Sequence, residues 1–565
     1  MKFKINQQLY TMSKLLHQKF LRGLLVFALF LTVTVSSGAA NFINPPTNGI
    51  LYVKKGLTGD GSSWTNALGE VAEALKIAKE LNTSAPGTVT QIWVAGGIYK
   101  PLYRADNMSG ANSTDRNNAF VVVKDVKMYG GFAGTETALT DRNLTLTANA
   151  SILSGDYNGD DVVTGSGSTL AVSNNSENAI HVVLSIASSA NPITNATVID
   201  GFTIKGGNAN VSAAPYINVN GLGLSGAIGG AMCNYYSSLV LTNSVVYGNR
   251  SISNSSAINN TFSSLIMNNV TISKNGGNPN SCIGNFDSSP IMTNIIMTDN
   301  DFGIYNATNS SPVITNAVIA NNNMHGIYND GATCNPVLTN VTITGAQYYA
   351  MTSNYASPKI RNCIIAGNMA GGVVAVYGQT NNAVITNSLV QEMAANGTNI
   401  NGSLDPLFTN PAAGDYTLQA CSPAINVGSN AYYDAGSTPN LSAVTTDLGG
   451  DMRIQDTTID MGAYEFEPLP MHLTLQSTSL TFGQVCMNTN GEGTFVFGAV
   501  NMNSATLVVS ALAGYSYSLT QNGTYTPTLT IPNYNNEVTT VYVRFTPTAI
   551  QPYNGTIYLA AHQNF

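Results

Sequence analysis

The sequence has few charged residues. Asp, Glu, Lys and Arg make up 9% of its 565 residues, with 30 acidic and 22 basic side chains. Five of the basic residues lie within the first 22 positions, so the rest of the chain carries 17 and has a formal net charge of −13. Nucleic acid and anionic lipid are therefore poor partners. The polar surface must consist mainly of amides and hydroxyls, which is typical of extracellular β-structure.

Long apolar runs are also scarce. The one at the start spans Leu24 to Val35, follows the five basic residues and precedes the small residues Ser36 to Ala40. This pattern predicts a secretory signal peptide over residues 1–40, cleaved near Ala39 or Ala40. The run is too short for a membrane-spanning helix and no second run of spanning length follows, so an N-terminal anchor is the less favoured alternative.

A short phrase recurs along the middle of the chain with an asparagine at a fixed place. It first appears as "LVLTNSVVYGN" and later as "PIMTNIIMTDN" and "PVITNAVIANN". The marker asparagines are Asn243, Asn269, Asn294, Asn316, Asn340, Asn362 and Asn387, spaced 22 to 26 residues apart. A propeller blade would be nearly twice as long, and the leucine consensus of a leucine-rich repeat is missing.

The apolar positions of the phrase locate a corner. The residue two before each asparagine and the residue three after it are apolar, as Leu241 and Val246 are in the first copy. Inward positions on one unbroken strand differ by an even number, whereas these differ by five, so the chain must bend between them. Asparagine tolerates the left-handed backbone that such a bend needs. A second set of asparagines, six residues further on, is expected to mark the next corner.

One phrase per coil predicts an all-β fold, a right-handed parallel β-helix with asparagine ladders whose rungs are ~4.8 Å apart. Upstream, Ser62 to Asn82 has the periodicity of an amphipathic helix, which we expect to cap the first coil. The Gly-rich and Ala-rich stretch 208–230 is either an irregular coil or a loop that leaves the rod.

The cysteine spacings match no zinc site, and no disulfide is expected within the rod, where Cys363 is predicted to be a core residue.

Several segments resemble a known group of proteins. "LYVKKGLTGDGSSWTNAL", "IWVAGGIYKP", "MYGGFAGTE" and "VIDGFTIKGGN" resemble the opening half of secreted bacterial proteins of the pectin-lyase-like β-helix superfamily, often likened to polymorphic outer-membrane proteins. "DPLFTNPAAGDYTLQACSPAINVGSN" and "TDLGGDMRIQDTTIDMGAYEFE" resemble the choice-of-anchor Q domain, which closes such helices. The resemblance implies export and display at the surface, on the outer-membrane exterior of a Gram-negative bacterium, and no settled activity.

The repeat disappears after "EFEPLP". Short alternating strands follow, which predict a β-sandwich of immunoglobulin type and resemble the modules that precede sorting tails in surface proteins of Bacteroidetes-like bacteria. In that pattern more chain would follow Phe565. The expected organisation is a signal peptide (1–40), an N-terminal cap and β-helix (41–400), a choice-of-anchor-Q-like end of the helix (401–467) and the sandwich (468–565).

Catalytic groups are scarce in the repeat region. Between Leu239 and Ile400 the chain has five acids and four bases, whereas lyases and hydrolases of this fold need clustered acids. The best cluster is Asp299, Asp301 and His325, which the register could bring together on adjacent coils. Asp299 also stacks on Lys274, so a surface ion pair is the favoured interpretation.

Two further sets of residues suggest ligands. In "DYNGDD", Asp156, Asn158 and Asp160 place oxygens at alternate positions as a calcium loop does, although an Asx-rich turn explains them more simply. Aromatic residues, among them Tyr305 and Tyr328, recur in each coil, as a sugar-binding strip or as stacked rungs. Lys359 and Arg361 share a strand face that suits an anionic glycan, with a solvated face as the favoured alternative.

Three functions fit these observations. A secreted or surface rod that binds a glycan or a surface protein without catalysis explains the low charge and the repeats. A polysaccharide lyase or glycoside hydrolase fits the fold but lacks clustered acids, and a passive spacer predicts no binding at all. The architecture hosts all three, and the first is the prediction adopted here. It requires no cofactor, with calcium as an option, and involves neither nucleic acid nor a transmembrane helix in the mature chain.

Overall fold

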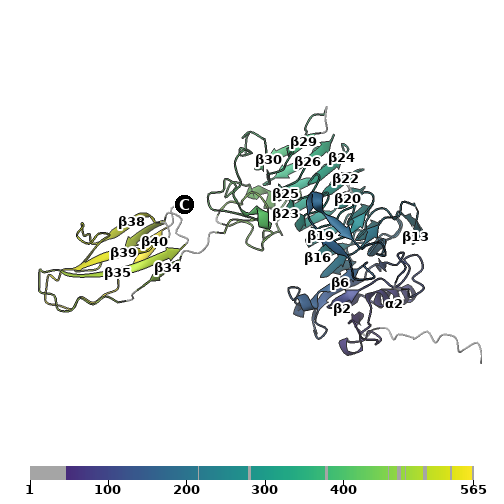
Figure 1. The fold of residues 1–565 in the computed structure, drawn as a ribbon, viewed down its shortest axis with the longest axis horizontal. Coiled ribbons are helices and arrows are strands. Elements are labelled where there is room, and N and C mark those ends of the chain that lie inside the picture. Colours follow the sequence, from purple (N-terminus) through teal and green to yellow (C-terminus); the bar gives the residue numbers. More distant parts are fainter. Residues whose placement is uncertain are drawn as a thin grey trace, which may run out of the picture. The chain divides into compact units, whose positions relative to one another are not determined.

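The structure is a computed structural model that describes residue 46 and residues 48–562, apart from 113, 214, 278–280, 376–378, 456, 468–471, 477–478, 501–504 and 535–536. The predicted signal peptide lies outside these residues. The chain forms two compact units that divide between Phe466 and Glu467, and both consist mainly of strands (Figure 1). Within the described ranges, no helix is both long and apolar enough to cross a bilayer.

Two parallel sheets form the walls of the first unit (Figure 1). The sixteen-stranded sheet contains β1 (Ile50–Val53), β2 (Gln91–Ala95), β3 (Gly97–Tyr99), β5 (Lys127–Phe132), β6 (Ser151–Ser154), β10 (Val198–Asp200), β11 (Phe202–Lys205), β16 (Val240–Tyr247), β19 (Ile266–Ser273), β21 (Ile291–Thr298), β23 (Val313–Ala320), β25 (Val337–Thr344), β27 (Lys359–Arg361), β28 (Ile364–Ala366), β30 (Val384–Thr386) and β31 (Leu389–Val390). The nine-stranded sheet contains β4 (Phe120–Val121), β9 (Val183–Ile186), β15 (Met232–Tyr235), β18 (Ile258–Thr261), β20 (Ile283–Phe286), β22 (Ile304–Ala307), β24 (Ile327–Asp330), β26 (Tyr349–Asn354) and β29 (Gly371–Ala375). From β4 to β29 the chain alternates between the two sheets, and the apolar side chains between the sheets form one continuous core.

The predicted asparagine corner is confirmed. All seven marker asparagines have left-handed backbones, with φ between 47° and 55°. The pairing of β16 with β19 runs on both sides of the corner but skips Asn243 and Asn269 themselves. Leu241 and Val246 are fully buried on either side of it, as the spacing of five requires.

The second corner lies one residue earlier than predicted. Its left-handed residues are Gly248, Lys274, Asp299, Asn321, Gly345, Gly367 and Glu392, so Asp299 is itself a corner residue. The asparagines that follow point inward and form a ladder: Nδ2 of Asn249 donates to Oδ1 of Asn275 (3.0 Å), and Nδ2 of Asn275 donates to Oδ1 of Asn300 (3.1 Å). Their role is to satisfy one another's buried amides, whereas the turn itself falls on a residue that reaches the surface.

A further asparagine ladder lines the inside of the nine-stranded sheet, and the sequence analysis missed it. Nδ2 of each asparagine donates to Oδ1 of the next at 2.9 to 3.0 Å, and all members are fully buried: Asn234, Asn260, Asn285, Asn306 and Asn329. Buried amides are tolerated here because each one finds its partner in the next coil.

A helix covers the beginning of the rod, as predicted, but it starts later than predicted. α2 spans Val71–Ser84, and its buried face, which includes Val71, Leu75 and Ala78, packs into the same core as β1. The predicted helical stretch 62–70 is extended except for a single 3-10 turn, η1 (Trp64–Asn66). Gly69 lies against the carbonyl of Leu57, where no Cβ fits, and glycine also disfavours a helix interior.

The stretch 208–230 leaves the rod as a loop. It holds β12 (Asn208–Ala209), which pairs with β17 (Arg250–Ser251), and the hairpin β13 (Ile217–Val219) to β14 (Leu222–Leu224).

The remaining short elements are the hairpins β7 (Val162–Thr164) to β8 (Ala171–Ser173) and β32 (Phe408–Asn410) to β33 (Asp415–Leu418), and the 3-10 helices η2 (Leu139–Asp141), η3 (Thr147–Asn149), η4 (Gly167–Thr169), η5 (Pro411–Ala413) and η6 (Asn430–Tyr433).

The region 401–466 lies along the side of the last coils. Tyr433 donates its hydroxyl to Oδ1 of Asn340 (3.0 Å), and Arg453 reaches the carbonyl of Ala463 (3.1 Å) and Oδ1 of Asn316 (3.3 Å). Arg453 is paired with Glu465, and both side chains are 1% exposed. This region therefore covers the outside of the asparagine corner over several coils, in addition to following the last one.

The second unit is a β-sandwich. Its antiparallel sheets are β34 (His472–Leu475), β35 (Gly491–Val500), β39 (Thr539–Phe545) and β37 (Tyr515–Ser518), and β38 (Leu529–Tyr534), β36 (Ala505–Val509) and β40 (Leu559–His562). Alternating side chains such as Phe497, Leu507 and Val543 are fully buried and form a core separate from that of the rod.

The six cysteines are free thiols. Cys233, Cys282, Cys334 and Cys363 are buried in the β-helix unit, and Cys363 belongs to its main core, as predicted.

Candidate functional site

The outer face of the nine-stranded sheet carries a group of aromatic side chains. On β22 and β24 the inward residues, Ile304 and Asn306 on the first of them, are fully buried. The residues between them, Tyr305 and its register partner Tyr328, alternate to the outer face and are partly exposed. The same alternation places Phe286 outward on β20.

The rings lie next to one another from coil to coil. Ring centroids are 5.9 Å apart between Phe286 and Tyr305 and 5.8 Å apart between Tyr305 and Tyr328, the latter pair inclined by only 24°. His325, in the turn before β24, lies 5.4 Å from the ring of Tyr328 and 4.9 Å from that of Tyr348. We call these five residues the aromatic face.

Hydrogen bonds hold polar groups beside these rings. Asp330 accepts from the hydroxyl of Tyr305 (2.6 Å) and from Nδ2 of Asn354 (2.7 Å). Gln379 in turn donates to Oδ1 of Asn354 (2.6 Å). On the other side, Nδ1 of His325 and the hydroxyl of Thr352 are 2.9 Å apart. The ring of Tyr305 and the imidazole of His325 are thus held in place by neighbouring side chains.

The ionisable groups of the aromatic face are held in defined states. Burial lowers the pKa of His325 to about 4, so the imidazole is neutral at pH 7. Burial, and next to it the hydrogen bond to Asp330, raises the pKa of Tyr305 well above its ordinary value, so that its hydroxyl keeps its proton. Near neutral pH both rings are therefore uncharged.

The loop 208–230 bounds the aromatic face on one side. Ile217 and Val219 of its hairpin pack on Leu184 and Cys233, which are the outward residues of β9 and β15. The outer surface of the sheet is therefore covered over these two strands. Further along, Tyr348 is 47% exposed.

Asp299, Asp301 and His325 do not share a hydrogen-bonded site. Asp299 lies at a corner near Lys274 and Asn321, and burial raises the pKa of its carboxyl against the opposing effects of these two neighbours. Asp301 accepts from the backbone N–H of Gly277, in the preceding coil, at 2.7 Å. His325 instead faces Thr352, in the following coil.

The four residues predicted to bind ligand lie on two different sheets. Tyr305 and Tyr328 belong to the aromatic face, whereas Lys359 and Arg361 lie on β27 of the sixteen-stranded sheet. Arg361 donates to the carbonyl of Thr438 (2.9 Å), and its guanidinium lies 5.0 Å from the ring centre of Tyr432. Arg361 thus helps to hold the region 401–466.

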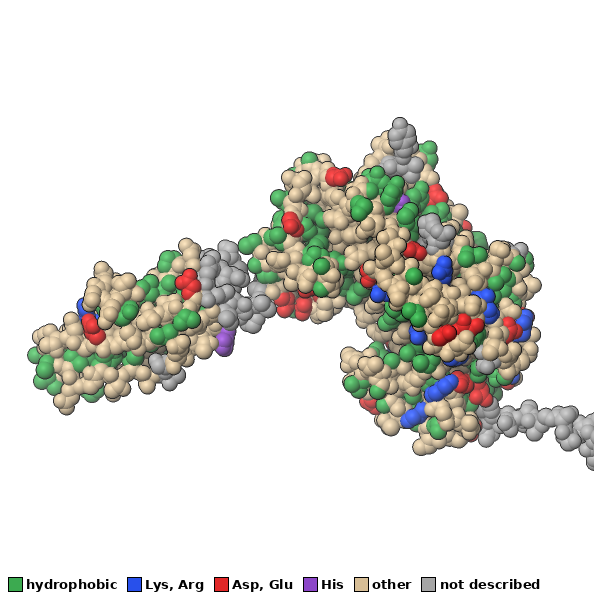
Figure 2. Space-filling view, viewed as in Figure 1, with side chains coloured by type: hydrophobic (Ala, Val, Ile, Leu, Met, Phe, Trp, Pro, Cys, Tyr) green, Lys and Arg blue, Asp and Glu red, His purple; other side chains and the backbone are tan. Residues whose placement is uncertain are grey.

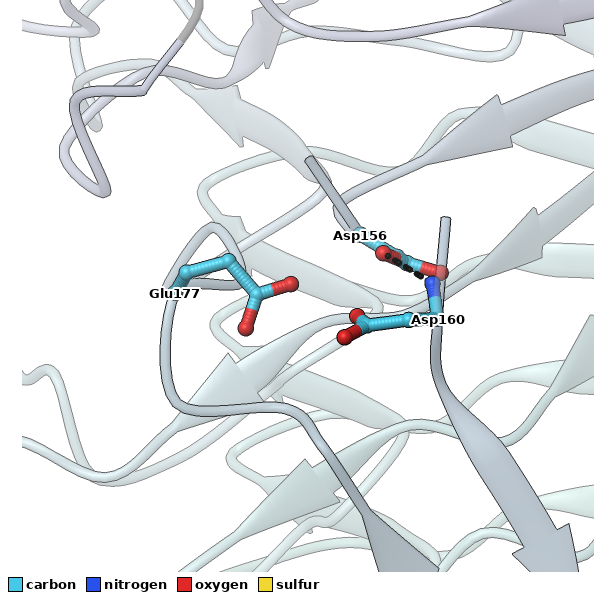
Figure 3. Close-up of side chains that lie close together, drawn as sticks. All are labelled: Asp156, Asp160 and Glu177. Carbon is cyan, nitrogen blue, oxygen red and sulfur yellow. Dashed lines mark hydrogen bonds between the residues drawn. The ribbon is translucent and has the colours of Figure 1, made fainter. Parts of the chain in front are cut away.

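A small acidic cluster lies at the loop after β6 (Figure 3). Asp156, Asp160 and Glu177 place carboxylate oxygens within 4.8 Å of one another, as a metal site could. Of the residues predicted to bind calcium, Asn158 is exposed and is not part of this group, and Glu177 takes its place. Because Glu177 comes from a separate loop, no local spacing in the sequence could have indicated it.

The acidic cluster also has the features of an ordinary turn. Oδ1 of Asp156 accepts from the backbone N–H groups of Gly159 (2.5 Å) and Asp160 (3.3 Å), which is an Asx-type arrangement. The adjacent Asp161 is bonded by Nδ2 of Asn178 (2.8 Å), yet burial and the nearby Asp156 and Glu177 raise the pKa of Asp161 to about 6. One oxygen each of Asp161 and Glu177 is buried without a hydrogen-bond partner.

The comparison with protein families matches the coils that carry the aromatic face. A family model described as "Right handed beta helix region" matches residues 229–390. The fold is a right-handed parallel β-helix. No curated protein matches the chain at a significant level.

The comparison with solved structures finds seven matching chains, three of which follow. One is a pectate lyase, Pel9A, with 12% identity and a TM-score of 0.40 over 74% of this chain and 96% of the other. Another is the catalytic unit of a GH87 alpha-1,3-glucanase from Streptomyces thermodiastaticus strain HF3-3. It has 9% identity and a TM-score of 0.23 over 56% of this chain and 64% of the other. The third is the enzymatically active domain of tailspike protein 2 from bacteriophage CBA120. It has 11% identity and a TM-score of 0.21 over 81% of this chain and 72% of the other. At such identities a similar fold does not imply a shared activity.

Proposed function

We propose that this protein is secreted or displayed at a cell surface and binds a glycan along the aromatic face without cleaving it. The observation that carries the proposal is the row of Phe286, Tyr305 and Tyr328 on consecutive coils, in which neighbouring rings are in contact and partly exposed along the rod. Aromatic rings of this kind offer an apolar surface next to polar groups, which suits the alternating C–H and hydroxyl surfaces of a sugar.

The polar groups beside the stack support binding rather than cleavage. Hydrolysis of a glycosidic bond commonly uses two carboxylates roughly 5–10 Å apart, one of them protonated. Asp330 contacts the aromatic face, and its two oxygens already accept hydrogen bonds from Tyr305 and Asn354. Together these groups can position hydroxyls, as a binding site requires.

Surface display is the cellular setting that we propose. It is supported by the apolar N-terminal segment, by the scarcity of charge, and by the resemblance of residues 401–467 to a choice-of-anchor Q domain and of the sandwich to immunoglobulin-like modules. The proposed binding requires no cofactor, since stacking and hydrogen bonds involve only side chains. Calcium at Asp156, Asp160 and Glu177 is a separate hypothesis, which predicts a rise in melting temperature on adding calcium that is absent in Glu177→Gln.

The test is a binding measurement on matched variants. Tyr328→Ala is expected to weaken glycan binding about five- to tenfold, because one stacking contact contributes roughly 1–1.5 kcal/mol. Tyr247→Ala is the matched control, since Tyr247 is a partly exposed tyrosine on β16 of the other sheet. Equal losses in the two variants would place binding elsewhere. Absence of binding to any glycan would favour a passive spacer.

A further inference from the structure

The stretch of chain that carries the aromatic face contains no Lys or Arg. From Asn275 to Pro358 the sequence has no Lys or Arg, while it has four acids, Asp287, Asp299, Asp301 and Asp330. On the side seen in Figure 2, the blue Lys and Arg side chains gather mainly over the N-terminal coils. An anionic chain bound along the aromatic face would therefore meet carboxylates and no fixed cation.

The elements next to the aromatic face add no charge of either sign. The segment 206–249, which includes the hairpin β13–β14, has no Asp, Glu, Lys or Arg, and neither does 362–391. His325 is packed among aromatic rings and is bonded to Thr352. At one edge of the face, Asp287 accepts from Nδ2 of Asn309 (2.8 Å).

Asp330 has a positioning role that explains why a carboxylate is present. It joins Tyr305 on one coil to Asn354 two coils away, and thereby orients a ring of the face and an amide beside it. Both of its oxygens serve this purpose. The remaining polar groups, Thr352, Asn354 and Gln379, are neutral and can both donate and accept, as sugar hydroxyls can.

We infer that the ligand of the aromatic face is a neutral polysaccharide, and that acidic polysaccharides such as polyuronates are excluded. This inference rests on the proposed function and narrows it. An acidic chain would need Lys, Arg or a bridging metal to offset its charge. The two basic residues whose shared strand face suits an anionic glycan, Lys359 and Arg361, lie on the other sheet.

The experiment measures binding of uncharged, acidic and basic oligosaccharides of equal length by calorimetry. The probes are hexamers of glucose, xylose and mannose, a galacturonate hexamer and a chitosan hexamer, each in EDTA at 20 and 500 mM NaCl. At least one neutral hexamer is expected to bind with little dependence on salt, and the galacturonate hexamer about tenfold more weakly or not at all at low salt. In Thr261→Lys, which adds a cation beside Phe286, binding of galacturonate is expected to strengthen.

The other outcomes separate the two proposals. If galacturonate binds as tightly as the neutral hexamers, or chitosan binds best, the aromatic face still binds glycan but the inference about its charge is wrong. If neutral hexamers bind equally to wild type and to Tyr328→Ala, the site is elsewhere and both proposals are wrong. The same holds if nothing in the panel binds.

Discussion

The side-chain nitrogen of Asn322 is buried without a hydrogen-bond partner, and the residue stacked on it in the next coil, Ala346, offers no side-chain acceptor. In the preceding coils Asn249, Asn275 and Asn300 each donate from Nδ2 to Oδ1 of the following asparagine at 3.0 to 3.3 Å. Ala346 interrupts this ladder, which starts again at Asn368, whose Oδ1 accepts from the backbone N–H of Ala346 at 3.1 Å.

Filling this gap should stabilise the rod. Ala346→Asn supplies an acceptor for Asn322 and is expected to raise the free energy of unfolding by about 1 kcal/mol. The opposite change, Asn300→Ala, removes the acceptor of the buried backbone N–H of Asn275 and should lower the free energy of unfolding by about 1–3 kcal/mol. Urea or thermal unfolding of both variants measures the difference, and a loss of stability in Ala346→Asn would show that the larger side chain does not fit.

The corner asparagines should be replaceable by glycine more easily than by alanine. Asn269 has a φ of 54°, is exposed, and donates to Oδ1 of Asn243 (3.2 Å). Asn269→Gly and Asn269→Ala both remove this hydrogen bond, so their difference isolates the backbone conformation. The alanine variant is expected to be less stable by about 1 kcal/mol, because a Cβ is strained in the left-handed region. Equal melting temperatures would contradict this.

Much of the fold followed from the sequence because its signals are repeated. The apolar positions around Asn243 and the left-handed corner recur in seven coils, so chance variation in one coil did not obscure them. The second corner was misplaced by one residue because Asn249 and its counterparts are as regular as a corner residue would be. The ladder from Asn234 to Asn329 was missed although it recurs equally often, since its asparagines lie among inward apolar residues.

The sites were less predictable because they depend on contacts between distant segments. The sequence singled out Tyr305 and Tyr328, but it did not relate them to Asp330 or Asn354, whose positions depend on the register of three strands. Glu177 reaches Asp156 from another loop. Nothing in the local spacing around Arg453 shows that it is buried against a corner more than a hundred residues away in the sequence.

Removing Arg453 should detach the region 401–466. Arg453 is almost fully buried with Glu465, and burial raises the pKa of Glu465 to about 7 despite the opposing charge of Arg453. Arg453→Met leaves the buried carboxyl of Glu465 without its cation and is expected to cost about 3–5 kcal/mol.

Arg361→Met is the matched control for Arg453→Met. Arg361 also holds this region but is partly exposed, so its loss should cost less than about 1 kcal/mol. Hydrogen exchange of residues 401–466 distinguishes the two variants. Similar protection from hydrogen exchange in the two variants would show that the buried pair of Arg453 and Glu465 does not hold this region.

The stability of the β-helix should depend on His325 in acid. The folded-state pKa of His325 is about 4, below its ordinary value of 6.5, so the unfolded chain binds the extra proton first. The contribution of His325 to the free energy of unfolding therefore falls as the pH drops from about 6.5 to about 4. Calorimetry at pH 7 and pH 4.5 should show a smaller loss of melting temperature in His325→Gln than in wild type. An unchanged loss would mean that His325 is accessible to protons in the folded state.

The central claim, binding without cleavage on the aromatic face, is tested most directly by following bound ligand and chain length in the same sample. Purified protein is incubated with a neutral polysaccharide that it retains, and the bound fraction and the reducing and unsaturated ends are measured over time for wild type, Tyr328→Ala and Tyr247→Ala. We expect stable binding by wild type and Tyr247→Ala, loss of binding in Tyr328→Ala, and no new chain ends in any sample. Steady release of new ends by wild type would contradict the account and identify the protein as an enzyme.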